Sequence, residues 1–419
     1  MKHVSKNIVY IGVNDREIDL IEGQYPVPDG ISYNSYMILD ETIAVMDSVD
    51  AAKTGEWLSN VEQALGGRKP DFLVVQHMEP DHSASISAFV EKYPSVTIVG
   101  NARTFVMISQ FFPALNLANT LEVKDGEQLR LGAHTLQFVF APMVHWPEVM
   151  MAYEMSEKVL FSADGFGRFG AWEADAEGKS DGQQQSCGQE PRGKQSCGQE
   201  PRGQQLQDMQ ENWVDEARRY YIGIVGKYGA QVQNVLKKAA ALDMQTICPL
   251  HGPVLSGNLE YYLKLYDTWS SYRPEKEGVC ICYASVYGHT EAVALLLADR
   301  LRKRGVEVVC HDLNREDWSR AVADAFCYDR LVLASITYNG DMFPSMKAFL
   351  AALAERGYRG RRVALVENGS WAPMASKVMM GAMEKWKDIT LAENNATIRS
   401  AENEAVRTQV EALAEELCR

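Results

Sequence analysis

Four potential metal ligands lie within six consecutive residues in the first quarter of the chain. The apolar run at residues 72–76 leads directly into HMEPDH at 77–82, which offers two imidazoles and two carboxylates. These groups are common ligands of transition metals, and a proline favours a loop where a buried strand ends. We therefore predict that His77, Glu79, Asp81 and His82 bind metal.

Three further candidates follow strand-like apolar runs in the same half of the chain. They are His145 in MVHWPE, Asp164 in FSADGFG and His251 in PLHGP. A lone histidine is more often bonded to backbone in a core or at a surface, and for His145 alone that interpretation would be the better one. The order and spacing of the whole set favour a metal site. Trp146 either lines its pocket or packs in the core.

Three polar loops in the last third of the chain predict a flavin site. The first, SVYGHT at 285–290, supplies hydroxyl groups and a tight turn at Gly288 to the start of a predicted helix, which suits a monophosphate ester. A nucleoside triphosphate would call for a lysine-containing loop and a magnesium ligand, and neither motif occurs.

The second and third loops add polar groups and two flat aromatic side chains that suit an isoalloxazine ring. One such loop alone would be an ordinary strand-to-helix turn, but three in the correct order indicate a flavin site. The predicted cofactor-binding residues are Ser285, Val286, Tyr287, Gly288, His289, Thr290, Thr337, Tyr338, Asn339, Gly340, Asn368, Gly369, Ser370 and Trp371.

The elements that must position these residues differ between the two parts of the chain. From about residue 5 to 165, short β-rich runs alternate with loops and a few helical patches, which predicts a sandwich of sheets with helices outside. Helical periodicity extends over 211–243, and a helix at 259–271 precedes a linker, SYRPEKEG. After residue 278, five strands alternate with five helices, which predicts a doubly wound, five-stranded parallel sheet. We place one domain at 1–272 and the other at 277–419.

Residues from about 173 to 208 have a different composition. They are rich in Gly, Gln, Ser and Lys, and the octapeptide SCGQEPRG occurs twice, at 186–193 and 196–203. A segment with so little apolar surface cannot form a core, so we interpret it as a loop inserted into the first domain. Cys187 and Cys197 leave a metal-binding or redox role open.

Composition excludes several classes of function. A net charge of −14 opposes binding to nucleic acid. No apolar stretch approaches the length of a membrane span, and the start of the chain lacks a signal peptide, so we expect a soluble cytoplasmic protein without membrane partners. The eight cysteines include no Cys-x-x-Cys pair, which argues against a built-in rubredoxin module.

Two family resemblances rest on these motifs. The loop at 285–290 resembles the phosphate loop of flavodoxin, although His289 stands where related proteins more often carry Asn. The segment at 77–82 resembles the His-x-His-x-Asp-His motif of the metallo-β-lactamase superfamily, but Glu79 replaces its second histidine. An added carboxylate favours iron over zinc through ligand hardness, which points to redox chemistry.

The two motifs in this order resemble the flavodiiron proteins. The resemblance implies an N-terminal metallo-β-lactamase-like αββα sandwich, a C-terminal flavodoxin-like domain, FMN and two non-haem irons. It implies that His77, Glu79 and His145 bind one iron, that Asp81, His82 and His251 bind the other, and that Asp164 bridges them.

By the same resemblance the protein reduces dioxygen to water, nitric oxide to nitrous oxide, or both, with no obligatory acid or base from a side chain. The electron donor would be rubredoxin or a rubredoxin-reductase system, and the chain would form a head-to-tail homodimer or a dimer of dimers. Two alternatives remain: a zinc hydrolase with an accessory flavodoxin-like domain, and a flavin electron carrier with a degenerate metal domain.

Overall fold

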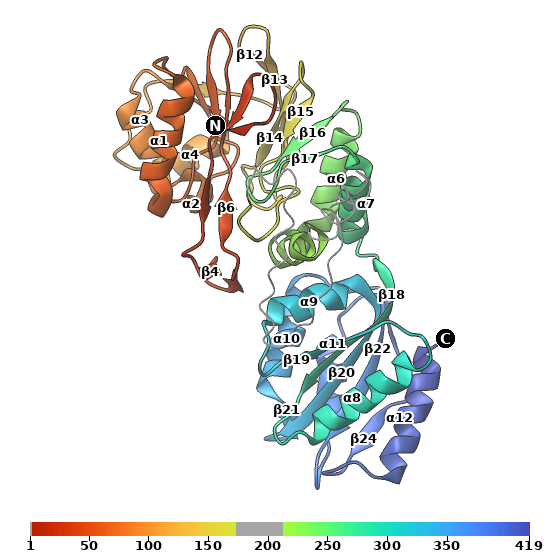
Figure 1. Cartoon of the computed structure of the whole chain (residues 1–419). Coiled ribbons are helices and arrows are strands. Elements are labelled where there is room, and N and C mark those ends of the chain that lie inside the picture. Colours follow the sequence, from red (N-terminus) through yellow and green to blue (C-terminus); the bar gives the residue numbers. More distant parts are fainter. Residues whose placement is uncertain (1, 173–212) are drawn as a thin grey trace, which may run out of the picture.

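The computed structural model describes residues 2–172 and 213–419. The insert predicted at about 173–208, with Cys187 and Cys197, lies outside the described residues. Figure 1 shows two bodies, a sandwich of two sheets and, below it, a sheet with helices on both faces.

The first body contains two mixed sheets packed face to face. In spatial order, the first sheet consists of β1 (Lys2–His3), β2 (Ile8–Tyr10), β7 (Tyr36–Ile38), β8 (Ala44–Met46), β9 (Phe72–Val74), β10 (Thr97–Gly100) and β11 (Thr120–Glu122). The second consists of β12 (Gln128–Arg130), β13 (Thr135–Phe140), β14 (Met150–Glu154), β15 (Val159–Phe161), β16 (Thr246–Cys248) and β17 (Leu255–Ser256).

Strand β8 shows why these short runs are apolar at every position. Successive side chains of a strand point to opposite faces of its sheet. Ala44 and Met46 face the second sheet, whereas Val45 packs against the outer helices. Because both faces are covered, alternation between polar and apolar residues disappears.

Helices cover both outer faces of the sandwich, which confirms the predicted αββα architecture (Figure 1). Those beside the first sheet are α1 (Thr54–Leu65), α2 (Pro80–Ser83), α3 (Ile86–Lys92) and α4 (Ala102–Phe111). Those beside the second are a helical segment at 213–220, α6 (Gly229–Ala239) and α7 (Leu259–Ser270).

Two strand pairs stand apart from the sheets: β3 (Val13–Asp15) with β6 (Ile31–Tyr33), and β4 (Leu20–Ile21) with β5 (Tyr25–Pro26).

The prediction of one continuous helix over 211–243 is wrong. After residue 220 the chain forms a π-helical turn, Tyr221–Val225, and a 3₁₀ turn, Gly226–Tyr228, before α6 begins. Glycines at 223, 226 and 229 weaken the α-helix here. A Cβ atom on Gly223 would lie 2.9 Å from the Tyr25 ring, so glycine is required for this contact.

The second body confirms the predicted flavodoxin-like sheet. Its order is β19 (Val308–Asp312), β18 (Lys276–Ala284), β20 (Tyr328–Tyr338), β22 (Arg361–Asn368) and β23 (Ile389–Leu391), and these five strands pair in parallel. The fifth strand is split, because β24 (Ala396–Ile398) also pairs with β22. A short β21 (Asp341–Met342) pairs with β20. β18 begins at Lys276, inside the predicted linker, which is therefore shorter than expected.

Two helical layers cover this sheet. One contains α8 (His289–Arg302) and α12 (Glu404–Leu417), and the other contains α9 (Trp318–Cys327), α10 (Pro344–Glu355) and α11 (Ala375–Met383). β21 lies at the end of this body that faces away from the sandwich (Figure 1). In residues 2–172 and 213–419, no helix is long and apolar enough to cross a membrane.

Candidate functional site

The segment that follows β9 is held by backbone hydrogen bonds to a buried carboxylate. Asp47 Oδ1 accepts the amide hydrogens of Gln76 at 2.7 Å and of His77 at 3.2 Å. Pro80 then begins the single turn α2, which places Asp81 and His82 on a helical turn directly after Glu79. A strand end and a proline-initiated turn thus set the directions of the four ligand candidates at 77–82.

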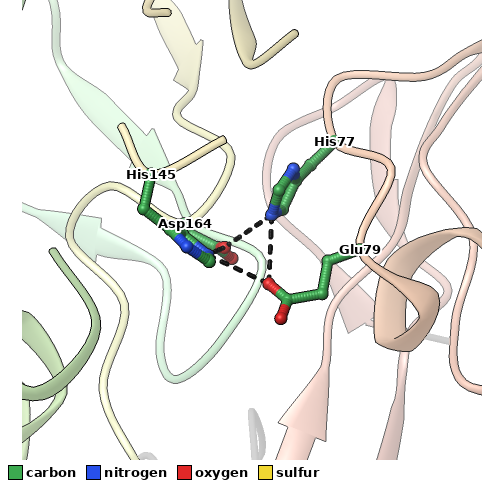
Figure 2. Close-up of side chains that lie close together, drawn as sticks. All are labelled: His77, Glu79, His145 and Asp164. Atoms are coloured by element: carbon green, nitrogen blue, oxygen red, sulfur yellow. Dashed lines mark hydrogen bonds and ion pairs between the residues drawn. The ribbon is translucent and has the colours of Figure 1, made fainter. Parts of the chain in front are cut away.

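Four side chains from three segments converge at one point, as Figure 2 shows. Glu79 Oε2 lies 3.2 Å from His77 Nε2 and 3.0 Å from His145 Nε2. Asp164 Oδ2 lies 3.2 Å from each of the same two nitrogens. Two imidazoles and two carboxylates therefore surround a common centre.

A second group lies on the other side of Asp164. His82 Nε2 is 3.3 Å from Asp81 Oδ2 and 3.0 Å from His251 Nε2. Asp164 Oδ1 approaches these two rings at 3.2 and 3.8 Å. The two oxygens of Asp164 thus face different groups, which is the geometry of a bridging carboxylate. Together the seven residues form the ligand cage.

Hydrogen bonds at Nδ1 identify the tautomers of two cage histidines. His251 Nδ1 lies 2.7 Å from the carbonyl oxygen of Ser32, and His77 Nδ1 lies 2.8 Å from Glu148 Oε1. A carbonyl oxygen and a carboxylate only accept, so each Nδ1 must carry the hydrogen. In the neutral form of each ring the lone pair is then at Nε2, which faces the cage, as metal ligation requires.

The cage is built to hold positive charge. Burial opposes protonation of His77, but Asp164, Glu148 and Glu79 outweigh it and raise its pKa well above the usual value. The balance is the same at His145, where burial opposes protonation but Asp164 and Glu79 raise the pKa to about 9. Burial disfavours the ionised form of Asp164, yet the surrounding imidazoles hold its pKa well below the ordinary range.

The donor set fits two iron ions. Each group offers two imidazole nitrogens and one carboxylate of its own, and Asp164 is shared. Asp164 Oδ1 and Asp81 Oδ1 are buried and accept no hydrogen bond from the described residues, an arrangement that a coordinated cation would satisfy. Mixed imidazole and carboxylate ligation suits iron, whereas a structural zinc site more often contains thiolate.

A pocket of about 220 Å³ opens onto the cage. It is lined by three cage residues, Glu79, Asp81 and His251, and by Ile18, Ile21, Glu22, Tyr33, Asp50, Pro80, Tyr220 and Ile224. Trp146 does not line it; its ring lies 5.4 Å from the His77 ring at 87°, an edge-to-face packing contact.

The three predicted flavin loops meet at one edge of the parallel sheet, after β18, β20 and β22. Thr337 Oγ1 accepts the amide hydrogens of Met374 and Ala375 at 2.9 and 3.2 Å, which ties the second loop to the third. Asn368 Nδ2 lies 3.4 Å from Thr290 Oγ1, which ties the third loop to the first. The structure therefore brings the predicted segments 285–290, 337–340 and 368–371 together.

Within this edge the predicted residues differ in exposure. Thr290 and Asn368 are buried, whereas Tyr287 and Trp371 are 86% and 90% exposed and Tyr338 is 48% exposed. Gly288 and Asn339 have positive φ, as tight turns around a ligand require. The large exposed aromatic faces are available to a flat ring.

The sequence patterns did not predict the residues that support the candidate ligands. Asp47, Glu148 and Ser32 each bond to a ligand residue and are buried. Glu148 lies in the MVHWPE motif, three residues after His145, so an acidic residue beside a ligand was a usable signal. The sequence around Asp47 and Ser32 contains no pattern that would have predicted their contacts with the cage residues.

Comparisons with known proteins agree with this geometry. A family profile described as "ODP family beta lactamase" matches residues 31–252, and a flavodoxin domain profile matches 280–386. The chain is 26% identical to the anaerobic nitric oxide reductase flavorubredoxin of Vibrio vulnificus, over 88% of this chain and 70% of that protein.

Two solved structures share the fold. The flavodiiron protein of Giardia intestinalis superposes with a TM-score of 0.85 at 25% identity, over 100% of this chain and 95% of that one. The rubredoxin oxygen:oxidoreductase of Desulfovibrio gigas also gives 0.85, at 23% identity, over 100% of this chain and 98% of that one.

Proposed function

This chain belongs to the ODP family of β-lactamase-fold proteins and continues into a flavodoxin domain, which is the arrangement of the flavodiiron oxidoreductases. We propose that it passes electrons from a protein donor through FMN to two irons that reduce dioxygen, nitric oxide or both. Residues 1–272 would hold the irons, and 277–419 the FMN.

The position of Glu79 carries this proposal. In a zinc hydrolase of this superfamily the equivalent position offers a neutral imidazole, whereas Glu79 directs a carboxylate oxygen to within 3.2 Å of the Nε2 atoms of His77 and His145. The hard anionic oxygen stabilises the higher charge of ferric iron. A side chain turned away from the cage would have favoured the hydrolase.

The seven cage residues would perform distinct tasks. Asp164 would hold the two ions at a fixed separation, because its two oxygens face different groups. His77 and His251 would bind through Nε2, because Nδ1 of each ring is held by another acceptor. The raised pKa of His77 means that metal binding would displace a proton from its ring. Two ferrous ions would together supply two electrons and reduced FMN two more, which equals the four needed to convert dioxygen to water. Two electrons would suffice to couple two nitric oxide molecules.

The pocket favours a very small substrate. Its volume of about 220 Å³ lies below the roughly 300–1,000 Å³ typical of sites for drug-sized ligands. Ile18, Ile21 and Ile224 provide apolar contacts that suit an uncharged diatomic gas, and the acidic side chains of Glu22 and Asp50 in the same lining disfavour an anionic hydrolase substrate.

The separation of the two sites within one chain supports a dimer. The loop at 337–340 leads into β21, at the end of the flavodoxin-like body that faces away from the sandwich (Figure 1). We infer a head-to-tail homodimer, or a dimer of dimers, in which the flavin of one subunit lies beside the cage of its partner. Chains that dissociate on dilution yet keep full turnover would contradict this arrangement.

We also infer that the electron donor is a rubredoxin or a rubredoxin-reductase-type protein. The V. vulnificus relative is named as a flavorubredoxin and the D. gigas protein as a rubredoxin oxygen:oxidoreductase. A reduced rubredoxin that is reoxidised by this protein only when oxygen or nitric oxide is present would support the inference.

Metal and flavin analysis of the purified full chain tests the proposal. Two irons and one FMN per chain would support it; two zincs would indicate the hydrolase, and FMN alone the electron carrier. Stopped-flow reoxidation of the reduced protein with each gas then measures which substrate is preferred.

A further inference from the structure

Glu148 is a fully buried carboxylate that lies outside the cage and bonds to one of its histidines. It follows His145 by three residues and precedes β14. Its Oε1 accepts hydrogen bonds from His77 Nδ1 and from the Met78 amide, each at 2.8 Å. The structure therefore contains a chain of contacts from this carboxylate through the His77 ring to the cage.

The backbone beside this carboxylate is fixed by another element. Asn101 Nδ2 donates to the carbonyl oxygen of Glu148 at 2.6 Å, and the Asn101 side chain also caps α4. Glu148 Oε2 has no hydrogen-bond partner in the described residues. A buried carboxylate left with an unpartnered oxygen is costly unless positive charge lies nearby. Cations in the cage would provide that charge.

The two halves of the cage are otherwise closely matched. Each has two imidazoles and one carboxylate of its own, and both share Asp164. Their supporting contacts differ, because His77 Nδ1 bonds to the charged Glu148 whereas His251 Nδ1 bonds to the neutral carbonyl group of Ser32. A charged partner makes an imidazole a stronger electron donor than a neutral one does.

Asp47, the other buried carboxylate beside the cage, does not create this difference. Its Oδ1 accepts backbone amides rather than a ring nitrogen. Among the described acidic residues outside the cage, Glu148 is the one that bonds to a ring nitrogen of a cage histidine.

Building on the proposed function, we propose that Glu148 is a positioning residue that makes the two irons inequivalent. It fixes the His77 ring with its Nε2 lone pair in the cage, and its charge makes the iron held by His77, Glu79 and His145 the more easily oxidised of the pair. In oxidation of the fully reduced centre, this iron then loses its electron first.

The test compares Glu148→Gln with Glu154→Gln in the full chain loaded with iron and FMN. Glutamine keeps the shape and a hydrogen-bond acceptor but removes the charge. Glu154 is a matched control, because it is equally buried, lies in β14 and accepts amide hydrogens from Thr135, Ser156 and Glu157 without contacting the cage. Iron content is measured first, and both one-electron potentials are then measured by redox titration followed by electron paramagnetic resonance.

We expect Glu148→Gln to raise the potential of the first oxidation step, with a change of about tenfold in its equilibrium constant, which corresponds to about 59 mV. The potential of the second oxidation step should change much less, and Glu154→Gln should change neither potential. Glu148→Ala should also weaken iron binding by roughly 10- to 100-fold, and Glu148→Asp should restore part of the loss.

Other outcomes overturn the inference. Unchanged potentials in Glu148→Gln, or equal shifts of both steps, would show that Glu148 does not distinguish the irons. A shift as large in Glu154→Gln would assign the effect to general destabilisation. A wild-type protein without iron would overturn the proposed function and this inference together, whereas two irons with potentials insensitive to Glu148→Gln would overturn this inference alone. If Glu148→Ala does not fold, the nearly isosteric Glu148→Gln variant still tests whether Glu148 makes the two irons inequivalent.

Discussion

Arg356 of the flavodoxin-like domain donates a hydrogen bond from Nη2 to the Tyr25 hydroxyl group of the sandwich at 2.9 Å. Tyr25 in turn donates to the carbonyl oxygen of Gly223 at 2.8 Å. Tyr25 lies in β5, and its hairpin partner β4 carries Ile21, which lines the pocket over the cage. The second domain therefore supports one wall of the pocket in the first.

Replacement of Tyr25 by Phe should destabilise the full chain. The variant removes one acceptor of the buried Arg356 guanidinium and the donor to Gly223, and loss of buried polar partners costs about 1–3 kcal/mol. Thermal unfolding measures the change. Tyr93→Phe is the control, because the Tyr93 hydroxyl group bonds to no other described residue. Equal midpoints for the two variants would show that the contact contributes nothing.

Replacement of Asp164 by Asn should reduce the bound iron at both positions. Asp164 faces both halves of the cage, and an amide cannot offer two anionic oxygens. We expect well below two irons per chain with FMN content unchanged, as measured by elemental analysis and flavin absorbance. Asp125→Asn, at a partly exposed ion pair with Lys238, is the control. Full iron occupancy in Asp164→Asn would refute the bridging role.

The change Glu79→His should shift metal preference from iron towards zinc. It replaces a hard anionic oxygen by a neutral nitrogen at the position that faces His77 and His145. The variant and the wild type are expressed with equal iron and zinc in the medium, and the iron-to-zinc ratio is measured in each. A ratio that stays the same would remove the argument that this carboxylate selects iron.

Stability should decrease between about pH 6.5 and pH 9 because of His311. Burial disfavours its protonation, but Asp324 and Glu316 outweigh it, each 2.9 Å from a ring nitrogen, and the pKa is raised to about 9. A raised folded-state pKa stabilises the protein fully below the unfolded-state pKa of about 6.5, and this contribution is lost as the pH rises through about 9.

Urea unfolding at several pH values, compared between the wild type and His311→Gln, isolates this effect. The difference in unfolding free energy should shrink by on the order of 3 kcal/mol from pH 6 to pH 10. His3→Gln, at an exposed residue of β1, is the control. A difference that is independent of pH would show that His311 does not gain its proton on folding.

Truncation of Trp371 to Ala should weaken FMN binding. The ring is 90% exposed beside the three loops, and loss of an aromatic stacking contact costs about 0.5–1.5 kcal/mol, or roughly two- to tenfold in Kd. Flavin fluorescence titration of the apoprotein measures Kd, and Trp371→Phe should keep most of the affinity. Unchanged Kd in Trp371→Ala would place the flavin elsewhere.

Local patterns were sufficient to predict both fold types and every residue that the structure brings into the cage. The segment at 77–82 concentrates four candidate ligands within six residues, and the regular alternation after residue 278 specifies a parallel sheet, because each of these features is encoded by neighbours in the chain. The metal and flavin roles of these residues stay predictions that the experiments above test.

Only the tertiary structure determined how distant residues meet. His82 and His251 are 169 positions apart and approach to 3.0 Å, and Glu148 reaches His77 across 71 positions. The interruption after residue 220 also depends on a distant residue, Tyr25. Sequence patterns report the chemistry of short segments, whereas sheet pairing and packing decide which segments are adjacent. The sequence by itself therefore determined the candidate ligands, and the fold determined how these residues are grouped and which residues support them.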